Sequence, residues 1–203
     1  PLPYTASPVD LRKVRTYPLQ ERKNKVKVSD FASQAVAGRS IRDLLEGLPR
    51  ILAGDDFRRL VSAITSAYAG SKPVIAMMGG HVIKCGLAPV IISMMEQRIL
   101  TGIAMNGAAS IHDFEIALIG ETSEDVENNI TTGKFGMWEE TGRLMNQAVK
   151  AGRDGHEGMG MALARKLVDL KAPHLDVSVM AAAFRLSIPV TVHVAIGTDI
   201  IHQ

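Results

Sequence analysis

Cysteine and aromatic residues are scarce in this sequence, and long hydrophobic runs are missing. Cys85 is the single cysteine, which excludes an internal disulfide framework and fits a reducing compartment. Aromatic residues make up 4%, so the core has to be built from aliphatic residues and the 10 methionines. The longest apolar run, residues 87–95, is far shorter than the ~20 residues that a membrane span needs. No N-terminal segment resembles a signal peptide, and we expect a cytoplasmic protein without a membrane partner.

A large excess of charge of one sign is lacking too. The formal net charge is +2, which is too small to indicate a nucleic-acid partner even though the pI is 8.8. Hydrophobic residues make up 46% of the 203 residues and the mean hydropathy is +0.10, which is enough for a sizeable core. We predict an N-terminal extension or oligomer arm over residues 1–38, with a short edge strand around Val26 and Val28, followed by one domain over residues 39–203.

Residues 72–118 are predicted to contain two successive units of strand, small-residue turn and helix. The predicted pairs are strand 74–78 with helix 82–95, and strand 101–105 with helix 111–119. Two strands that are each followed by a helix imply parallel strands joined by right-handed crossovers. A third strand is indicated by residues 188–196, the strongest strand signal in the chain. The predicted fold class is therefore α/β, a Rossmann-like parallel sheet with helices on both faces.

Further helices are expected on both sides of this region. They cover residues 41–48 behind the N-cap Ser40, residues 56–68, a short segment at which Thr122 and Asp125 have N-capping spacing, residues 137–151, a helix ending near Leu170, and a helix starting at Asp176 or Ser178.

Small and polar residues follow the first two strands directly. In a parallel sheet, ligands bind beyond the carboxyl ends of the strands, where loops and helix N-termini converge. The residues predicted to fall there are Gly79, Gly80, His81, Asn106, Gly107, His112 and Asp113. Glycines let the backbone approach a ligand, and helix N-termini supply amide donors to a phosphate. The G-x-G-x-x-G fingerprint is absent, however, and glycine turns also serve close packing of a helix on a sheet.

Ionisable residues at the strand ends leave a second class of function open. Three histidines and two carboxylates could form a metal site of a hydrolase or isomerase. These residues are His112, Asp113, His193, Asp199 and His202. No histidine pair has helical ligand spacing, and a lone histidine in a strand is more often a packed residue. Cys85 and Trp138 are interpreted as packing residues. A non-catalytic nucleotide-binding scaffold, the third possibility, would need only the glycine turns.

Several blocks between residues 72 and 202 resemble the deoxyhypusine synthases in order and spacing. Residues 79–87 look like the family's Thr-Ser-Asn-Leu-Ile-Ser-Ser-Gly-Ile segment, and residues 106–113 are similar to its Thr-Ala-Gly-Gly-Ile-Glu-Glu run. Residues 178–190 resemble a block ending His-Ile-Pro-Val, and residues 195–199 fall where the family has Ala-Leu-Thr-Asp-Gly.

The chain departs from the family at several functional positions. His81, His112 and Ser187 stand where the family has asparagine, glutamate and an active-site histidine. The family's imine-forming lysine, a nucleophile central to its chemistry, lies in sequence that this chain does not contain. The resemblance therefore indicates a divergent relative that lacks the C-terminal lysine region, and we do not expect this chain alone to carry out deoxyhypusine transfer.

The resemblance implies NAD-dependent transfer or oxidation of a polyamine-type amine by a homo-oligomer, a tetramer in the family, with a protein lysine as a second partner. By position, it assigns cofactor binding to Gly79, Gly80, His81, Asn106, Gly107, Ala108 and Thr198. It assigns catalysis to Asp113, His112 and Asp199. We expect Asp113 to face the ligand as an ionised carboxylate, because a helix N-terminus favours negative charge, and His112 to stay neutral for the same reason. The alternative is that Asp113 only caps its helix.

Overall fold

The computed structural model describes residues 9–34 and 36–202. Its internal contacts divide the chain into two units, Pro1–Ser62 and Ala63–Gln203. This boundary lies inside a helix, α2 (Leu52–Ala69), and so differs in position from the predicted boundary at residue 38. Within the predicted extension, residues 1–8 and 35 lie outside the described residues.

The regular elements of the described part of the first unit are all helical, and they are separated by irregular segments. Short turns η1 (Leu11–Lys13), η2 (Leu19–Glu21) and η3 (Val28–Asp30) precede α1 (Ile41–Gly47). The predicted cap of α1 is confirmed: the Ser40 hydroxyl accepts from the Asp43 amide, and the Asp43 carboxylate accepts from the Ser40 amide. The predicted edge strand around Val26 and Val28 is wrong, because the Lys27 amide donates to Asp30 and closes η3.

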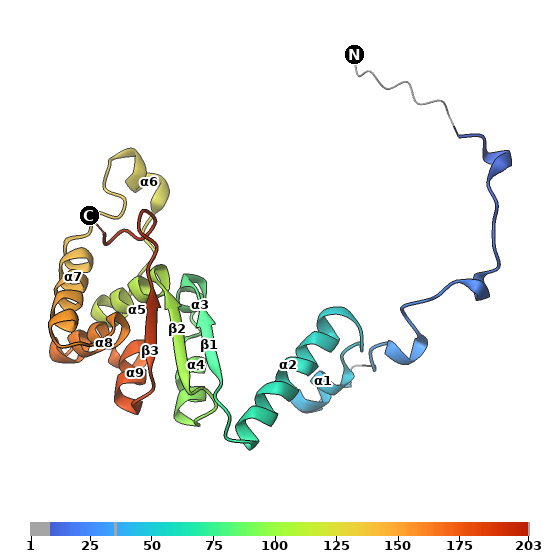
Figure 1. The fold of residues 1–203 in the computed structure, drawn as a ribbon, viewed down its shortest axis with the longest axis horizontal. Coiled ribbons are helices and arrows are strands. Elements are labelled where there is room, and N and C mark those ends of the chain that lie inside the picture. Colours follow the sequence, from blue (N-terminus) through green and yellow to red (C-terminus); the bar gives the residue numbers. More distant parts are fainter. Residues whose placement is uncertain (1–8, 35, 203) are drawn as a thin grey trace, which may run out of the picture. The chain divides into compact units, whose positions relative to one another are not determined.

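A three-stranded parallel sheet organises the second unit (Figure 1). The strands β1 (Ile75–Met78), β2 (Gly102–Asn106) and β3 (Val190–His193) lie in the order β1-β2-β3. Met77 pairs with Ala104, and Ala104 pairs with Thr191. The predicted parallel α/β arrangement is confirmed, and all three strands lie where the sequence predicted them, although β3 is shorter than expected.

Helices connect and follow these strands. They are α3 (Gly80–Lys84), α4 (Ala88–Glu96), α5 (Gly107–Ile119), α6 (Val126–Thr131), α7 (Glu139–Asp154), α8 (Met159–Asp169) and α9 (Val179–Leu186), with the turn η4 (Leu175–Val177) before α9. The single helix predicted over residues 82–95 is wrong. Gly86 interrupts it with φ of 79°, in the left-handed region that favours glycine, and α3 and α4 result.

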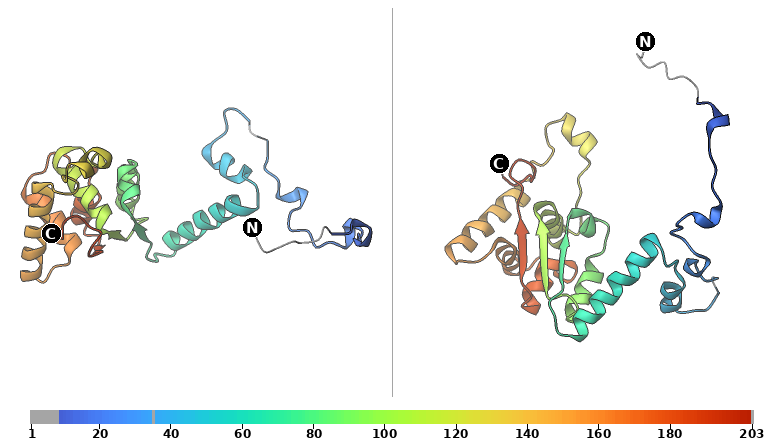
Figure 2. Two further views of the ribbon diagram at one scale, coloured as in Figure 1. Left: turned by 90° about the horizontal axis from the view of Figure 1, so that it is seen from above. Right: turned by 45° about the vertical axis from the view of Figure 1, so that its right-hand side comes forward.

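The helices of the second unit cover one face of its sheet (Figures 1 and 2). Ile103 and Met105 of β2 point into this core and meet Phe114 of α5, and all three side chains are buried. On the opposite face, Ile75 and Met77 of β1 are 61% and 81% exposed. The prediction of helices on both faces is therefore wrong for the second unit.

Candidate functional site

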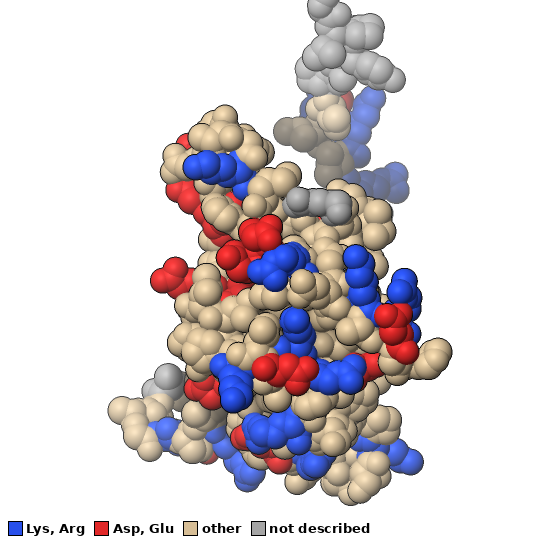
Figure 3. Space-filling view, turned by 90° about the vertical axis from the view of Figure 1, so that its left-hand side faces the viewer, with Lys and Arg blue, Asp and Glu red and all other residues tan. Residues whose placement is uncertain are grey.

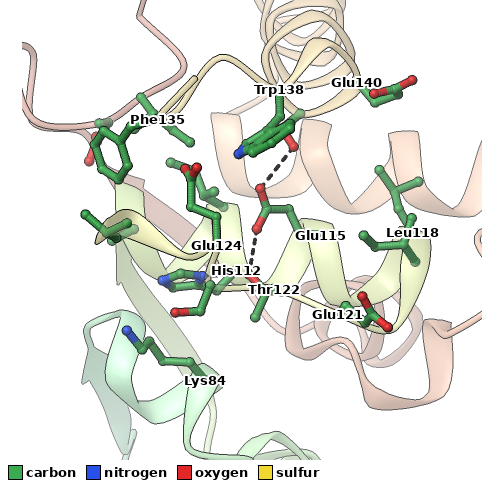
Figure 4. A pocket seen from close by; sticks show the side chains of 18 of the residues that line it. Lys84, His112, Glu115, Leu118, Glu121, Thr122, Glu124, Phe135, Trp138 and Glu140 are labelled. Carbon is green, nitrogen blue, oxygen red and sulfur yellow. Dashed lines mark hydrogen bonds between the residues drawn. The ribbon is translucent and has the colours of Figure 1, made fainter. Parts of the chain in front are cut away.

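A pocket of about 700 Å³ lies beside α5, within the second unit. Its walls come from α5, from the segment between α5 and α7, from the turn after β3, and from Lys84 at the end of α3. Five carboxylates line it, Glu115, Glu121, Glu124, Glu140 and Asp199, together with the basic residues Lys84 and His112. Phe135 and Trp138 supply aromatic surface (Figure 4).

Helix α5 has one face toward this pocket and another toward the core. Asn106 caps its first turn, since its side-chain oxygen accepts from the Ala109 amide at 2.8 Å. His112 and Glu115 are three residues apart, on the same side of the helix, and both line the pocket. Asp113 and Phe114 lie on the core side, where both are completely buried.

Glu115 joins three elements through hydrogen bonds. Its Oε2 accepts from the Thr122 hydroxyl at 2.6 Å, and its Oε1 accepts from the Thr141 hydroxyl at 3.0 Å (Figure 4). Thr141 lies in the first turn of α7 and Thr122 follows α5, so this carboxylate fixes both segments against α5. The Nδ1 atom of His112 lies 2.7 Å from the same Thr122 oxygen.

These bonds determine which nitrogen of His112 carries the proton when the imidazole is neutral. A threonine hydroxyl has one hydrogen to donate, and Thr122 donates it to Glu115. The hydrogen between Thr122 and His112 must then belong to Nδ1, which leaves a lone pair on Nε2. Burial lowers the pKa of His112, Glu115 raises it in part, and Lys84 and His81 lower it further. The expected neutral form of His112 therefore agrees with its surroundings.

Two further pocket carboxylates, Glu124 and Asp199, accept hydrogen bonds from backbone and side-chain amides. Glu124 accepts from the Gly136 amide at 2.9 Å and from the Asn129 side chain at 3.0 Å. Asp199 accepts from the Ala195 amide at 2.8 Å and lies 3.6 Å from His202 Nε2. Across residues 9–34 and 36–202, none of the four pocket glutamates forms an ion pair. Acidic side chains gather below the α6 segment on the face shown in Figure 3.

Asp113 does not line the pocket. Its carboxylate caps the N-terminus of α9, where Oδ1 accepts from the Val179 amide at 2.8 Å and Oδ2 accepts from the Met180 amide at 3.0 Å and the Ser178 hydroxyl at 2.7 Å. Burial raises the pKa of Asp113, and these three hydrogen bonds lower it in part. The prediction of a ligand-facing carboxylate is therefore wrong in this geometry, and so is the alternative of a cap on its own helix.

The two glycines assigned to a cofactor are instead packed against side chains of the chain itself. A Cβ atom on Gly80 would lie 2.8 Å from Cδ2 of His112, and one on Gly107 would overlap the Asp199 carboxylate. A pyrophosphate brought to the Gly107 amide would meet that carboxylate, and like charges repel. This turn therefore does not fit the pyrophosphate of NAD.

The other assigned residues are dispersed around the turns. His81 is exposed on α3, and Gly79 lies beside Asn106, whose side chain already caps α5. Ala108 and Thr198 line the pocket, and the Thr198 hydroxyl donates to the Ala195 carbonyl at 3.1 Å.

The residues of the metal alternative do not assemble. His193 is exposed on β3 with Nε2 3.0 Å from the Thr191 hydroxyl, and Asp113 is enclosed at α9. In the part of the chain that the structure describes, no three His, Cys, Asp or Glu side chains are grouped as a metal ion requires. Cys85, predicted to be a core residue, is exposed. Trp138, also predicted to be a packing residue, lines the pocket and is 40% exposed.

Much of the pocket was missed from the sequence. The missed polar residues are Lys84, Glu115, Glu121, Thr122, Ser123, Glu124, Glu140 and Thr141. One signal was available: Glu115 follows His112 by three residues, which places both side chains on one side of a helix. The polar segment after Gly120 gave no comparable signal, because its residues meet α5 only through the tertiary fold.

No helix formed by the described residues combines the length and the apolar character needed to cross a membrane. Protein-family models and curated proteins were both searched, and neither search gives a match to this chain. The resemblance to deoxyhypusine synthases, with the cofactor, partners and oligomeric state that it implies, stays a prediction.

Proposed function

We propose that the pocket beside α5 binds an organic amine in its cationic form. The observation that carries this proposal is the charge of the lining: five carboxylates face a single lysine, around a space of about 700 Å³. A cleft lined by one sign of charge concentrates ligands of the opposite sign. Trp138 and Phe135 add aromatic faces, whose ring quadrupoles attract organic cations by about 0.5–1 kcal/mol at an exposed site and more at a desolvated one.

The proposed reaction is transfer or oxidation of a polyamine-type amine, the class that the resemblance to deoxyhypusine synthases implies. The acidic pocket supports the substrate half of this proposal. The use of NAD rests on the resemblance alone, and the Asp199 carboxylate at the Gly107 turn counts against it. NAD is therefore tested separately, as are a protein lysine as second partner and a homo-oligomer.

The test uses the fluorescence of Trp138, which is the chain's only tryptophan and lines the pocket. Spermidine is titrated into the full chain at low salt, with hexanol as an uncharged aliphatic control. We expect the fluorescence of Trp138 to change saturably with spermidine, and the affinity for spermidine to fall as added salt screens the charges. Absence of saturation with spermidine, confirmed by calorimetry, would overturn the amine-binding proposal.

Two variants separate the pocket from its surroundings. Glu140→Gln removes a pocket carboxylate for which the described residues offer no ion-pair partner, whereas Glu139→Gln removes a charge paired with Arg143 outside the pocket. One carboxylate near an ammonium group at a solvated site is worth about 1 kcal/mol, so Glu140→Gln should weaken spermidine roughly fivefold. Glu139→Gln should change affinity by less than about twofold.

Adding NAD to the spermidine complex tests the reaction. Growth of NADH absorbance would support amine oxidation. Spermidine binding without NADH formation or an amine-transfer product would favour a non-catalytic binding protein.

A further inference from the structure

We infer that Nε2 of His112 accepts a hydrogen bond from the ammonium group bound in the pocket, so that the site selects primary and secondary amines over quaternary ammonium ions. This inference rests on the proposed amine binding and adds the chemical class of the amine. A quaternary ion offers the same charge and fits the same carboxylates, but it has no N–H to donate.

The direction of the hydrogen bonds behind His112 is the first step. The carboxylate of Glu115 accepts from Thr122, and Thr122 then accepts from Nδ1 of His112. Nδ1 is therefore the protonated nitrogen, and the lone pair is on Nε2. In water a neutral histidine has no partner that fixes this choice, whereas here a part-buried chain of hydrogen bonds sets it.

The availability of that lone pair is the second step. No residue that the structure describes donates to Nε2 of His112, although the side chain lines the pocket. Gly80 packs closely against the edge of this ring, since a Cβ there would lie 2.8 Å from Cδ2 and 3.3 Å from Nε2. Nε2 of His112 is a half-buried acceptor beside several carboxylates. A ligand that carries both a positive charge and an N–H can bind the carboxylates and donate to Nε2.

The third step is that acceptance requires a neutral ring. The charged and titratable groups around His112 are His81 and Lys84 on α3, Glu115 on α5, and Glu124 and Asp199 from the other walls. Burial lowers the pKa of His112, Glu115 raises it in part, and Lys84 and His81 on α3 lower it further. Affinity for a primary amine should therefore be constant near neutral pH and be lost as the pH falls through this lowered pKa, because the imidazolium repels a cation and has no lone pair.

The experiment compares butylammonium with butyltrimethylammonium, using Trp138 fluorescence of the full chain. A hydrogen bond with a charged partner predicts a preference of at least about tenfold for butylammonium in the wild type. In His112→Phe, which keeps a planar ring, the preference should fall below about twofold. A preference that persists in His112→Phe would come from the size of the trimethyl group and would overturn the inference.

The tautomer is measured directly by two-bond ¹H–¹⁵N correlation spectra of ¹⁵N-histidine-labelled protein, with His112→Phe assigning its signals. The expected spectrum of wild type shows Nδ1 protonated and Nε2 bare. Thr122→Val should release this tautomer, while Thr141→Val, which removes only the other bond to Glu115, should retain it.

The outcomes separate this inference from the function beneath it. Equal binding of both probes, or Nε2 protonated in the wild type, would overturn the role of His112 and leave amine binding standing. Failure of spermidine and of both probes to bind would overturn the proposed function and this inference together.

Discussion

Asp113 is the residue whose replacement separates stability from ligand binding most clearly. Its carboxylate is fully buried between α5 and α9 and accepts hydrogen bonds from Ser178, Val179 and Met180. Two of these donors are backbone amides in the first turn of α9, which have no partner within the helix. Asp113→Ala leaves both amides without an acceptor in a site closed to solvent, next to a small cavity.

The cost follows from the number of donors left unpaired. A buried donor without an acceptor costs about 1–3 kcal/mol, so the loss of the acceptor for two backbone amides lowers the free energy of unfolding by roughly 2–6 kcal/mol. The Ser178 hydroxyl adds less, because its oxygen still accepts from the Ala181 amide. At about 3 °C per kcal/mol for a chain of this size, Tm should fall by roughly 10 °C. Asp113→Asn keeps one acceptor oxygen but points an NH₂ group at other donors, and should cost about half as much.

The assay is thermal unfolding followed by circular dichroism, with spermidine binding measured well below Tm. Asp176→Ala is the matched control, since this exposed carboxylate precedes the same helix and should change stability by less than about 0.5 kcal/mol. Both Asp113 variants should bind spermidine with unchanged affinity, because the side chain does not reach the pocket. The assignment of Asp113 as the cap of α9 is refuted if Tm of Asp113→Ala lies within about 2 °C of wild type, instead of about 10 °C below it. It is also refuted if the variant loses spermidine binding at unchanged Tm.

Three further predictions use the same measurements. Gly107→Ala should lower Tm by several degrees, because the methyl group displaces the Asp199 carboxylate. Gly142→Ala lies in open space in α7 and should stabilise the folded chain by about 0.5–1 kcal/mol. Equal Tm values for the two variants would contradict this prediction. Lys84→Met should tighten spermidine binding about threefold at low salt, as it removes the pocket's single lysine, and unchanged affinity by titration would count against an electrostatic site. The pKa of His112 is lowered in the folded chain, so the unfolded chain binds a proton at this residue more tightly. The free energy of unfolding, measured with urea, should therefore fall as the pH drops from about 6.5 to that lowered pKa. The fall should be smaller in His112→Gln.

The strands were predictable because a parallel sheet buries most of its backbone under apolar side chains. Runs such as that of β2 are short, apolar and end at a small-residue turn, and the end of β2 at Asn106 coincides with a helix cap. Caps were also readable at Ser40 and Ser178, whose side chains bond the third residue of the following helix. The open face of the sheet was not predictable, because an apolar residue such as Met77 looks the same in the sequence whether its side chain is covered or exposed.

The error at Asp113 could have been avoided by following the phase of α5. Ser110, Asp113, Phe114 and Ala117 recur at intervals of three and four, which is the pattern of a core face, and all four are buried. His112 and Glu115 are on the other stripe. Asp113 was assigned to the site of His112 because the two are adjacent in sequence, but adjacent side chains of a helix point about 100° apart.

The pocket itself depended on contacts that sequence spacing does not contain. Thr122 meets His112 across 10 residues and Thr141 meets Glu115 across 26. Thr122 was predicted to share a capping role with Asp125, but Asp125 alone caps α6, through the Asn128 amide. Whether a threonine caps a helix or orients a histidine depends on where its segment folds back, and local pattern cannot determine this.

His112 and Asp113 show how one turn of α5 serves two purposes without conflict. The Asp113 side chain accepts hydrogen bonds from backbone amides of α9 and so connects α5 to α9 in the core. His112, about a quarter turn away, receives its orientation from Glu115 through Thr122. Because the two hydrogen-bond networks share no atom, substitutions in one should add to substitutions in the other with little coupling. The double variant Asp113→Asn, Thr122→Val should therefore show the Tm loss of the first and the altered His112 tautomer of the second, each unchanged in size. Coupling between the two effects would mean that α5 moves as a body when its core side is loosened, and the pocket would then depend on the cap of α9 after all.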